Sequence, residues 1–151
     1  MYMWSWVSSA HVRASTSGAL SEENPHPWIY GLLLWMHSGG LDHITDFDLI
    51  NRKLQASLLD KFFNYPQGCT DSKWAFALFL NELSKVSQPG LSSFPYTTLK
   101  DTMFKTIQMI KEPHKESNIK ELIMLNFTVT NRKSVVPTRY VTSLTDKAAG
   151  L

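Results

Sequence analysis

The chain has 151 residues and a formal net charge of +2, and its one cysteine excludes an intramolecular disulfide framework. This length suits a single domain with a self-sufficient hydrophobic core. No stretch reaches the roughly 18 consecutive apolar residues of a membrane-spanning helix, and the apolar opening lacks the preceding Lys or Arg of a signal peptide. We therefore predict a protein of the cytoplasm or of a virion interior.

The first 26 residues predict a flexible N-terminal arm, because residues 8–26 are rich in Ser, Ala and Thr and show no periodicity. Three aromatic residues stand near its start: Tyr2, Trp4 and Trp6. No polar periodicity follows that would bury them, and exposed aromatic residues are typical of protein interfaces. We predict that these three form a protein-contact element.

Residues 27–38 predict a short buried helix. Pro27 suits the first helical position, and Gly39-Gly40 suits the stop. The segment is apolar almost all round, which favours a central position in the core. A buried strand remains the alternative, because periodicity cannot separate a helix from a strand in so short a run.

A second helix is predicted over residues 46–64, with Thr45 as its cap and Pro66 as its stop. Its apolar residues recur every three or four positions, as in a helix that packs one face on a core. They are Phe47, Ile50, Leu54, Leu58, Phe62 and Tyr65.

Two further helices follow along the chain. The third begins after Thr70 and ends before Pro89-Gly90, and its run 74–80 has no polar face, which predicts the centre of the core. The fourth begins at Thr97 or Thr98 and ends at Pro113. The core residues expected from both are Trp74, Phe76, Leu78, Phe79, Leu99, Met103, Ile107 and Ile110.

The C-terminal part mixes two patterns. Asn118 with Glu121 can start a fifth helix, but residues 127–131 alternate like a strand. Residues 127–144 then form either a hairpin across Asn131-Arg132 or an extended arm, in which Pro137 permits only an edge strand.

These patterns together predict a mainly α fold. We expect a single compact domain of four to five helices with a short C-terminal extended or β-hairpin segment. Its parts are a flexible arm over 1–26, a helical core over 27–126 and an extended basic segment over 127–151.

Positive charge gathers near the C-terminus, where residues 113–151 hold six basic and three acidic residues, a net +3. Such a segment can bind nucleic acid or an anionic surface, although +3 is modest beside a dedicated nucleic-acid arm. The residues that we assign to anion binding are Arg132, Lys133 and Arg139.

The string QGCTDSKWAF, residues 67–76, locally resembles the active-site segment of papain-like cysteine proteases. Lys73 stands where that family places its nucleophilic cysteine, and Cys69 comes four residues too early. The family's histidine and asparagine would lie beyond the end of this sequence. We interpret the match as a coincidence at a helix start.

A metal site is also considered at His37, Asp42, His43 and Asp46, whose side chains are acceptable zinc or manganese ligands. Their spacing matches no standard ligand pattern, and the favourable charges at helix ends explain most of them. The loop at 38–40 lacks the Lys of a phosphate-binding loop. We predict neither a metal nor a cofactor.

For function, the sequence offers no nucleophile and base that can be placed together. We predict a non-enzymatic interaction or assembly protein that binds itself or another protein, such as a small viral structural or matrix-like protein. The alternative is binding of nucleic acid or an anionic membrane surface through the basic C-terminal quarter. No small-molecule substrate is identified.

Overall fold

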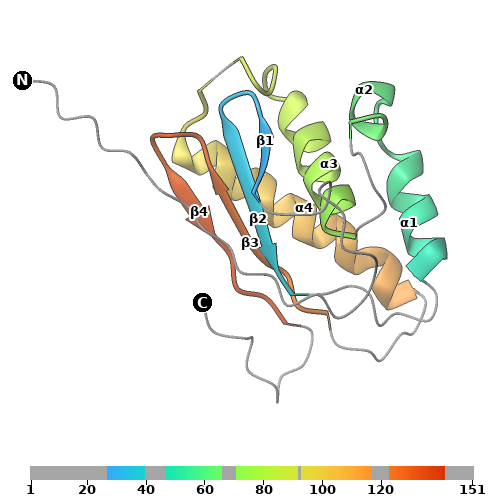
Figure 1. Cartoon of the computed structure of the whole chain (residues 1–151). Helices are drawn as coiled ribbons and strands as arrows, with labels where there is room; N and C mark the ends of the chain where they lie inside the picture. The colour runs from blue at the N-terminus through green and yellow to red at the C-terminus, as the bar shows by residue number, and fades with distance from the viewer. Residues whose placement is uncertain (1–26, 40–46, 66–70, 92, 117–122, 142–151) are drawn as a thin grey trace, which may run out of the picture.

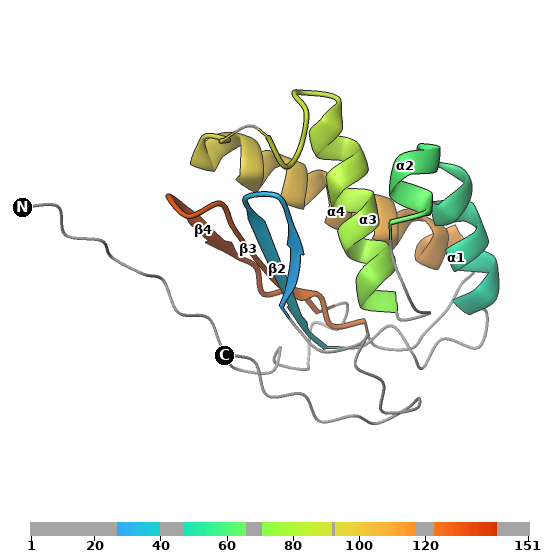
Figure 2. The ribbon, with the colours of Figure 1, turned by 45° about the horizontal axis from the view of Figure 1, so that its top comes forward.

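A computed structural model describes residues 27–39, 47–65, 71–91, 93–116 and 123–141. Within these ranges an antiparallel sheet has the strand order β1-β2-β3-β4, and helices cover one of its faces (Figures 1 and 2). The strands are β1 Trp28–Tyr30, β2 Leu33–Ser38, β3 Asn126–Thr130 and β4 Val135–Pro137. The helices are α1 Phe47–Ala56, α2 Asp60–Phe63, α3 Asp71–Ser84 and α4 Tyr96–Glu116.

The helix predicted over 27–38 is wrong, and the strand alternative is right, because this segment forms the β1–β2 hairpin. Gly31 has a φ of 59° and stands first in the two-residue turn, where a type II′ turn favours glycine. A Cβ on Gly31 would lie 2.2 Å from the Cα of Gly90, so the turn lies directly against the α3–α4 connection. The segment is apolar because β2 lies inside the sheet, paired on both sides.

The core lies between the sheet and helices α3 and α4. Along β2, buried residues alternate with partly exposed ones, as expected for a strand with one covered face. The ring of Trp35 lies 5.3 Å from that of Phe76, 5.1 Å from that of Phe79 and 4.7 Å from that of Phe127, measured between centroids. Phe76 and Phe79 are almost completely buried. Their predicted place in the core is confirmed.

The helix predicted over 46–64 is divided into α1 and α2. The hydroxyl of Ser57 donates to the carbonyl of Leu54 at 2.6 Å, and the backbone N–H of Leu59 donates to Oδ1 of Asn81 in α3 at 3.0 Å. Backbone groups at this point therefore bond outside a continuous helix. A side chain from α3 supplies the partner that makes the break stable.

The later elements follow the sequence prediction more closely. The third and fourth predicted helices are present as α3 and α4, although α4 continues past Pro113 to Glu116. The C-terminal hairpin is confirmed as β3 and β4, with Arg132 and Lys133 in its turn and Pro137 on an edge strand. The start of the predicted fifth helix lies outside the described residues, and residues 126–130 are strand.

The prediction of a mainly α fold is wrong, because the sheet is a full layer and contributes Leu33, Trp35, Phe127, Val129 and Val136 to the core. The chain has an α/β fold in which helices cover one face of an antiparallel sheet. Among the described residues no helix is both long and apolar enough to cross a membrane. The division at residues 26 and 126 stays a prediction.

Candidate functional site

The candidate site lies at the end of β2, where His37 is 2% exposed and faces the helices. The hydroxyl of Ser72, in the first turn of α3, lies 2.6 Å from Nδ1 of His37. Nε2 of His37 lies 3.2 Å from the carbonyl oxygen of Met124. Since a carbonyl only accepts, Nε2 carries the proton, and in a neutral imidazole Nδ1 then accepts from Ser72.

His37 thereby ties together three segments that are far apart in the sequence: the end of β2, the start of α3 and the approach to β3. Its ring also packs on Phe127, with the centroids 4.7 Å apart. Gly39, two residues after His37, also lies close against the backbone before β3. A Cβ on Gly39 would lie 2.2 Å from the carbonyl oxygen of Met124, and Gly39 has a φ of 145°, so only glycine fits there.

A hydroxyl hydrogen-bonded to an imidazole, with a third group orienting that imidazole, is the arrangement of a nucleophile and its base. Here, however, Ser72 is only 9% exposed and the imidazole less. Their hydrogen bonds to each other and to the carbonyl of Met124 join three segments of the chain. We therefore interpret His37 and Ser72 as a positioning pair that fixes the backbone around them, including Gly39.

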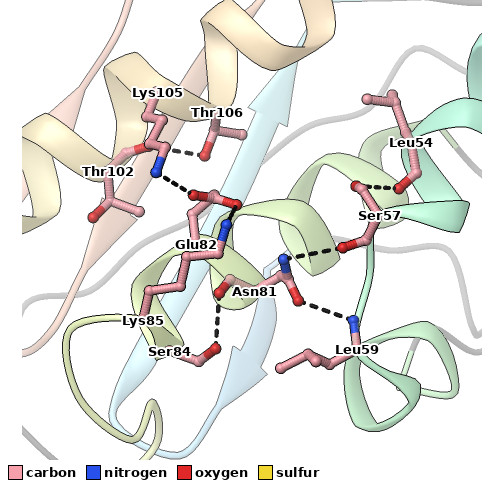
Figure 3. A network of polar contacts seen from close by, with 10 residues as sticks. All are labelled: Leu54, Ser57, Leu59, Asn81, Glu82, Ser84, Lys85, Thr102, Lys105 and Thr106. Atoms are coloured by element: carbon pink, nitrogen blue, oxygen red, sulfur yellow. Dashed lines mark hydrogen bonds and ion pairs between the residues drawn. The ribbon is translucent and has the colours of Figure 1, made fainter.

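A second set of polar contacts lies toward the other end of α3 and joins it to the α1–α2 connection and to α4 (Figure 3). The carboxylate of Glu82, almost completely buried, pairs with Lys105 at 2.7 Å and with Lys85 at 2.5 Å. Burial alone would raise the pKa of this carboxyl, but the hydrogen bonds and charges of the two lysines outweigh it and hold the pKa below the ordinary value of 4.5. The network joins helices and is structural.

The residues predicted to bind anions lie on either side of β4 along the chain. Arg132 and Lys133 are exposed in the β3–β4 turn, where Arg132 has a φ of 71°. Arg139 comes after β4, beyond the strand's other end.

Other residues singled out from the sequence have mixed outcomes. The predicted contact residues Tyr2, Trp4 and Trp6 lie outside the described residues, as do Cys69, Asp42, His43 and Asp46. His37 is brought to a polar site, but with a serine and a carbonyl in place of the metal ligands considered. No group of potential metal ligands occurs among the residues with described positions.

Sequence analysis missed Ser72 and Met124 as partners of His37. They lie 35 and 87 residues away along the chain. No local pattern marks a serine in the first turn of a helix, or a backbone carbonyl, as the partner of a distant histidine. His37 itself was considered as a metal ligand, and the Gly39-Gly40 pair beside it was interpreted as a helix stop.

Comparison with known proteins adds a direct likeness, although no family model matches the chain. The chain is 46% identical over 151 residues to the protein named probable glutamine amidotransferase DUG3 from Saccharomyces cerevisiae. The match covers 94% of this chain and 41% of the relative, so the chain spans about two fifths of the relative's length.

Among solved structures, the chain resembles a glutamine aminotransferase class-II domain protein from Silicibacter pomeroyi, with a TM-score of 0.55 and 20% identity. This match covers 80% of the chain and 50% of the solved one, and it supports the α/β fold.

These likenesses overturn the prediction of a non-enzymatic interaction or assembly protein, because the relative carries the name of an enzyme and matches almost the whole chain. The predictions of a viral structural role, of self-association as the function and of nucleic-acid or anionic-surface binding are wrong for the same reason. So is the expectation that no small-molecule substrate would be found. Location in the cytoplasm or a virion stays a prediction.

Proposed function

We propose that this chain contributes the glutamine-binding part of an enzyme that transfers the amide nitrogen of glutamine. The observation that carries the proposal is the 46% identity to the yeast relative over 94% of the chain. The fold shared with a class-II domain protein adds support. Because the chain covers only 41% of the relative, we assign glutamine recognition to this chain and do not assign the complete transfer reaction to it alone.

The part that the candidate site plays is positioning. Amide chemistry depends on holding the substrate carbonyl within a fraction of an ångström of the groups that attack it and that stabilise the developing charge. His37 anchors the segment that leads into Gly39, and Ser72 anchors the start of α3 to the same ring. Both segments border the end of β2, which is where we place the glutamine site.

The first experiment measures binding. L-glutamine should raise the thermal unfolding midpoint of the protein, since a ligand at about 100 times its Kd adds roughly 2.7 kcal/mol of stability. L-glutamate and D-glutamine serve as matched controls and should give much smaller shifts. Glutamate release from L-glutamine is followed in the same samples. A protein that shows neither a shift nor release at saturating L-glutamine would overturn the proposal.

The variant Ser72→Ala then tests the positioning role. If Ser72 were the nucleophile, glutamate release would fall by a factor on the order of 10⁴ or more. If it positions His37, release or glutamine affinity should fall by about tenfold, because one buried hydrogen bond is lost. The control is Ser84→Ala in the last turn of α3, which removes a hydroxyl bonded only within its own helix, to the carbonyl of Asn81.

A further inference from the structure

Asn126, the first residue of β3, carries a buried polar atom that lacks a partner. The residue is 3% exposed, and within the part of the chain that the structure describes its side-chain Oδ1 has no hydrogen-bond donor. Buried polar atoms are satisfied in the great majority of cases, and one left without a partner destabilises the folded protein. Such an atom calls for an explanation.

The side chain of Asn126, with its Oδ1 unpaired among the described residues, lies on the sheet face opposite the helices. Phe127 packs on Trp35 and His37 on the helix side, and successive residues of a strand point to opposite faces. Asn126 therefore points to the other face. Its direct cross-strand partner is Ser38, which shares that face and is partly exposed.

This place is also the end of the sheet that the His37 pair fixes. The Ser38 and Asn126 pair is the last rung of the β2–β3 ladder, next to the pair of His37 and Phe127. Gly39, held against the carbonyl of Met124, follows directly. A side chain on this rung is held by rigid backbone on both strands, which suits a binding group.

We propose that Asn126 is a substrate-binding residue whose Oδ1 accepts a hydrogen bond from an N–H group of glutamine. The inference rests on the proposed function, which supplies a substrate rich in N–H donors. Glutamine offers an ammonium group and a primary amide, and the amide of Asn126 can accept from such a donor through Oδ1 while its Nδ2 donates to a carbonyl. Ser38, the partner of Asn126 on this rung, is partly exposed, so the rung borders solvent.

A structural asparagine and a binding asparagine differ in what their replacement does. Replacing Asn126 by Leu, of similar shape, removes a polar atom that the free protein leaves unsatisfied, so the unfolding midpoint should stay the same or rise. Calorimetric titration with L-glutamine should meanwhile show a Kd about tenfold higher than that of the wild type. Asn126→Ser, which keeps a polar group but shortens its reach, should weaken glutamine binding similarly.

Asn131, at the other end of β3, is the matched control. It is 1% exposed, but its amide donates to the carbonyl of Phe94 at 2.6 Å and its Oδ1 accepts from the backbone N–H of Ser134 at 2.9 Å. Asn131→Ala should lower the unfolding midpoint and leave the Kd for glutamine within about twofold of the wild type. The two asparagines should thus show opposite effects.

The outcomes separate the two proposals. A wild-type protein that binds glutamine, together with Asn126→Leu and Asn126→Ser variants that bind it equally well, would overturn only the role of Asn126. A fall in the unfolding midpoint of both variants as large as that of Asn131→Ala would also overturn it, because Asn126 would then be structural. A wild-type protein that does not bind glutamine would overturn the proposed function and this inference together.

Discussion

The two ends of the sheet differ in whether a buried asparagine there has hydrogen-bond partners for its side chain. At the end that holds the turns, Asn131 closes the β3–β4 turn and bonds across to the segment that leads into α4. At the end where β2 stops, His37 holds two other segments together, but among the described residues the Oδ1 of Asn126 beside it has no hydrogen-bond donor.

Among the described residues, the turn end therefore contains the hydrogen-bond partners of Asn131, whereas the His37 end lacks one for the Oδ1 of Asn126. The turn end also contains the close approach of Gly31 to Gly90, and α3 ends there with the buried Glu82 between two lysines. The protein itself supplies the polar partners at that end. At the His37 end the described residues leave the Oδ1 of Asn126 free for the proposed hydrogen bond to glutamine. The predictions below perturb each end separately.

The largest effect is expected from Phe127→Ala, which removes a large side chain from the core. Phe127 is fully buried and its ring packs on Trp35 and His37. Truncating a buried Phe typically lowers the free energy of unfolding by about 3–5 kcal/mol. Urea denaturation measures it. Phe104→Ala is the control, since Phe104 is 57% exposed and should lose much less. Equal losses for the two variants would contradict the core assignment.

The next largest effect is expected from a variant that disturbs only the end of the sheet with the β3–β4 turn. Asn131→Ala leaves the carbonyl of Phe94 and the backbone N–H of Ser134 without their side-chain partners, so the free energy of unfolding should fall by about 1–3 kcal/mol. Hydrogen exchange should show faster opening of the β3–β4 turn, while the amide protection of β2 near His37 stays as in the wild type. Uniformly faster exchange would mean that the two ends are not independent.

The sequence predicted local elements well and pairings poorly. The apolar run of α3 and the alternation that leads into Asn131 each lie within a few residues, so α3, α4 and the C-terminal hairpin could be predicted. The β1–β2 hairpin could not, because Trp35 pairs with Val129, which is far along the chain, and that pairing determines that the segment is strand. With the hairpin missed, the sheet and hence the fold class were missed too.

The candidate site could not be predicted from the sequence for a related reason. His37 was visible as a chemically capable residue, but its partners are a serine hydroxyl and a backbone carbonyl, which carry no sequence signal. Asn126 was even less visible, since an unsatisfied oxygen is a property of packing and not of residue order. A fold prediction that includes the β2–β3 register is needed before either residue can be singled out.

A smaller effect tests the pair at the His37 end. Ser72→Ala, His37→Ala and the double variant form a cycle whose coupling free energy should be about 0.5–1.5 kcal/mol, the net value of one buried hydrogen bond. Urea denaturation of the four proteins measures it. The same cycle built on Ser84 and His37, which are not bonded to each other, should give a coupling near zero. A coupling free energy near zero between Ser72 and His37 would contradict their interpretation as a positioning pair.

The smallest effect at neutral pH is expected at Glu82, and it grows with acid. Because the folded protein holds the pKa of this carboxyl below 4.5, its ionised form adds stability above that pH, and this stability is lost as the pH falls through the lowered value. The two lysines are more than half exposed, so solvent screens part of the attraction. The wild type should therefore lose more stability than Glu82→Gln between pH 6 and pH 3, as measured by urea denaturation. Parallel pH profiles would show that the ion pairs do not hold this end. A steeper profile for Glu82→Gln would reverse the sign that the two lysines predict.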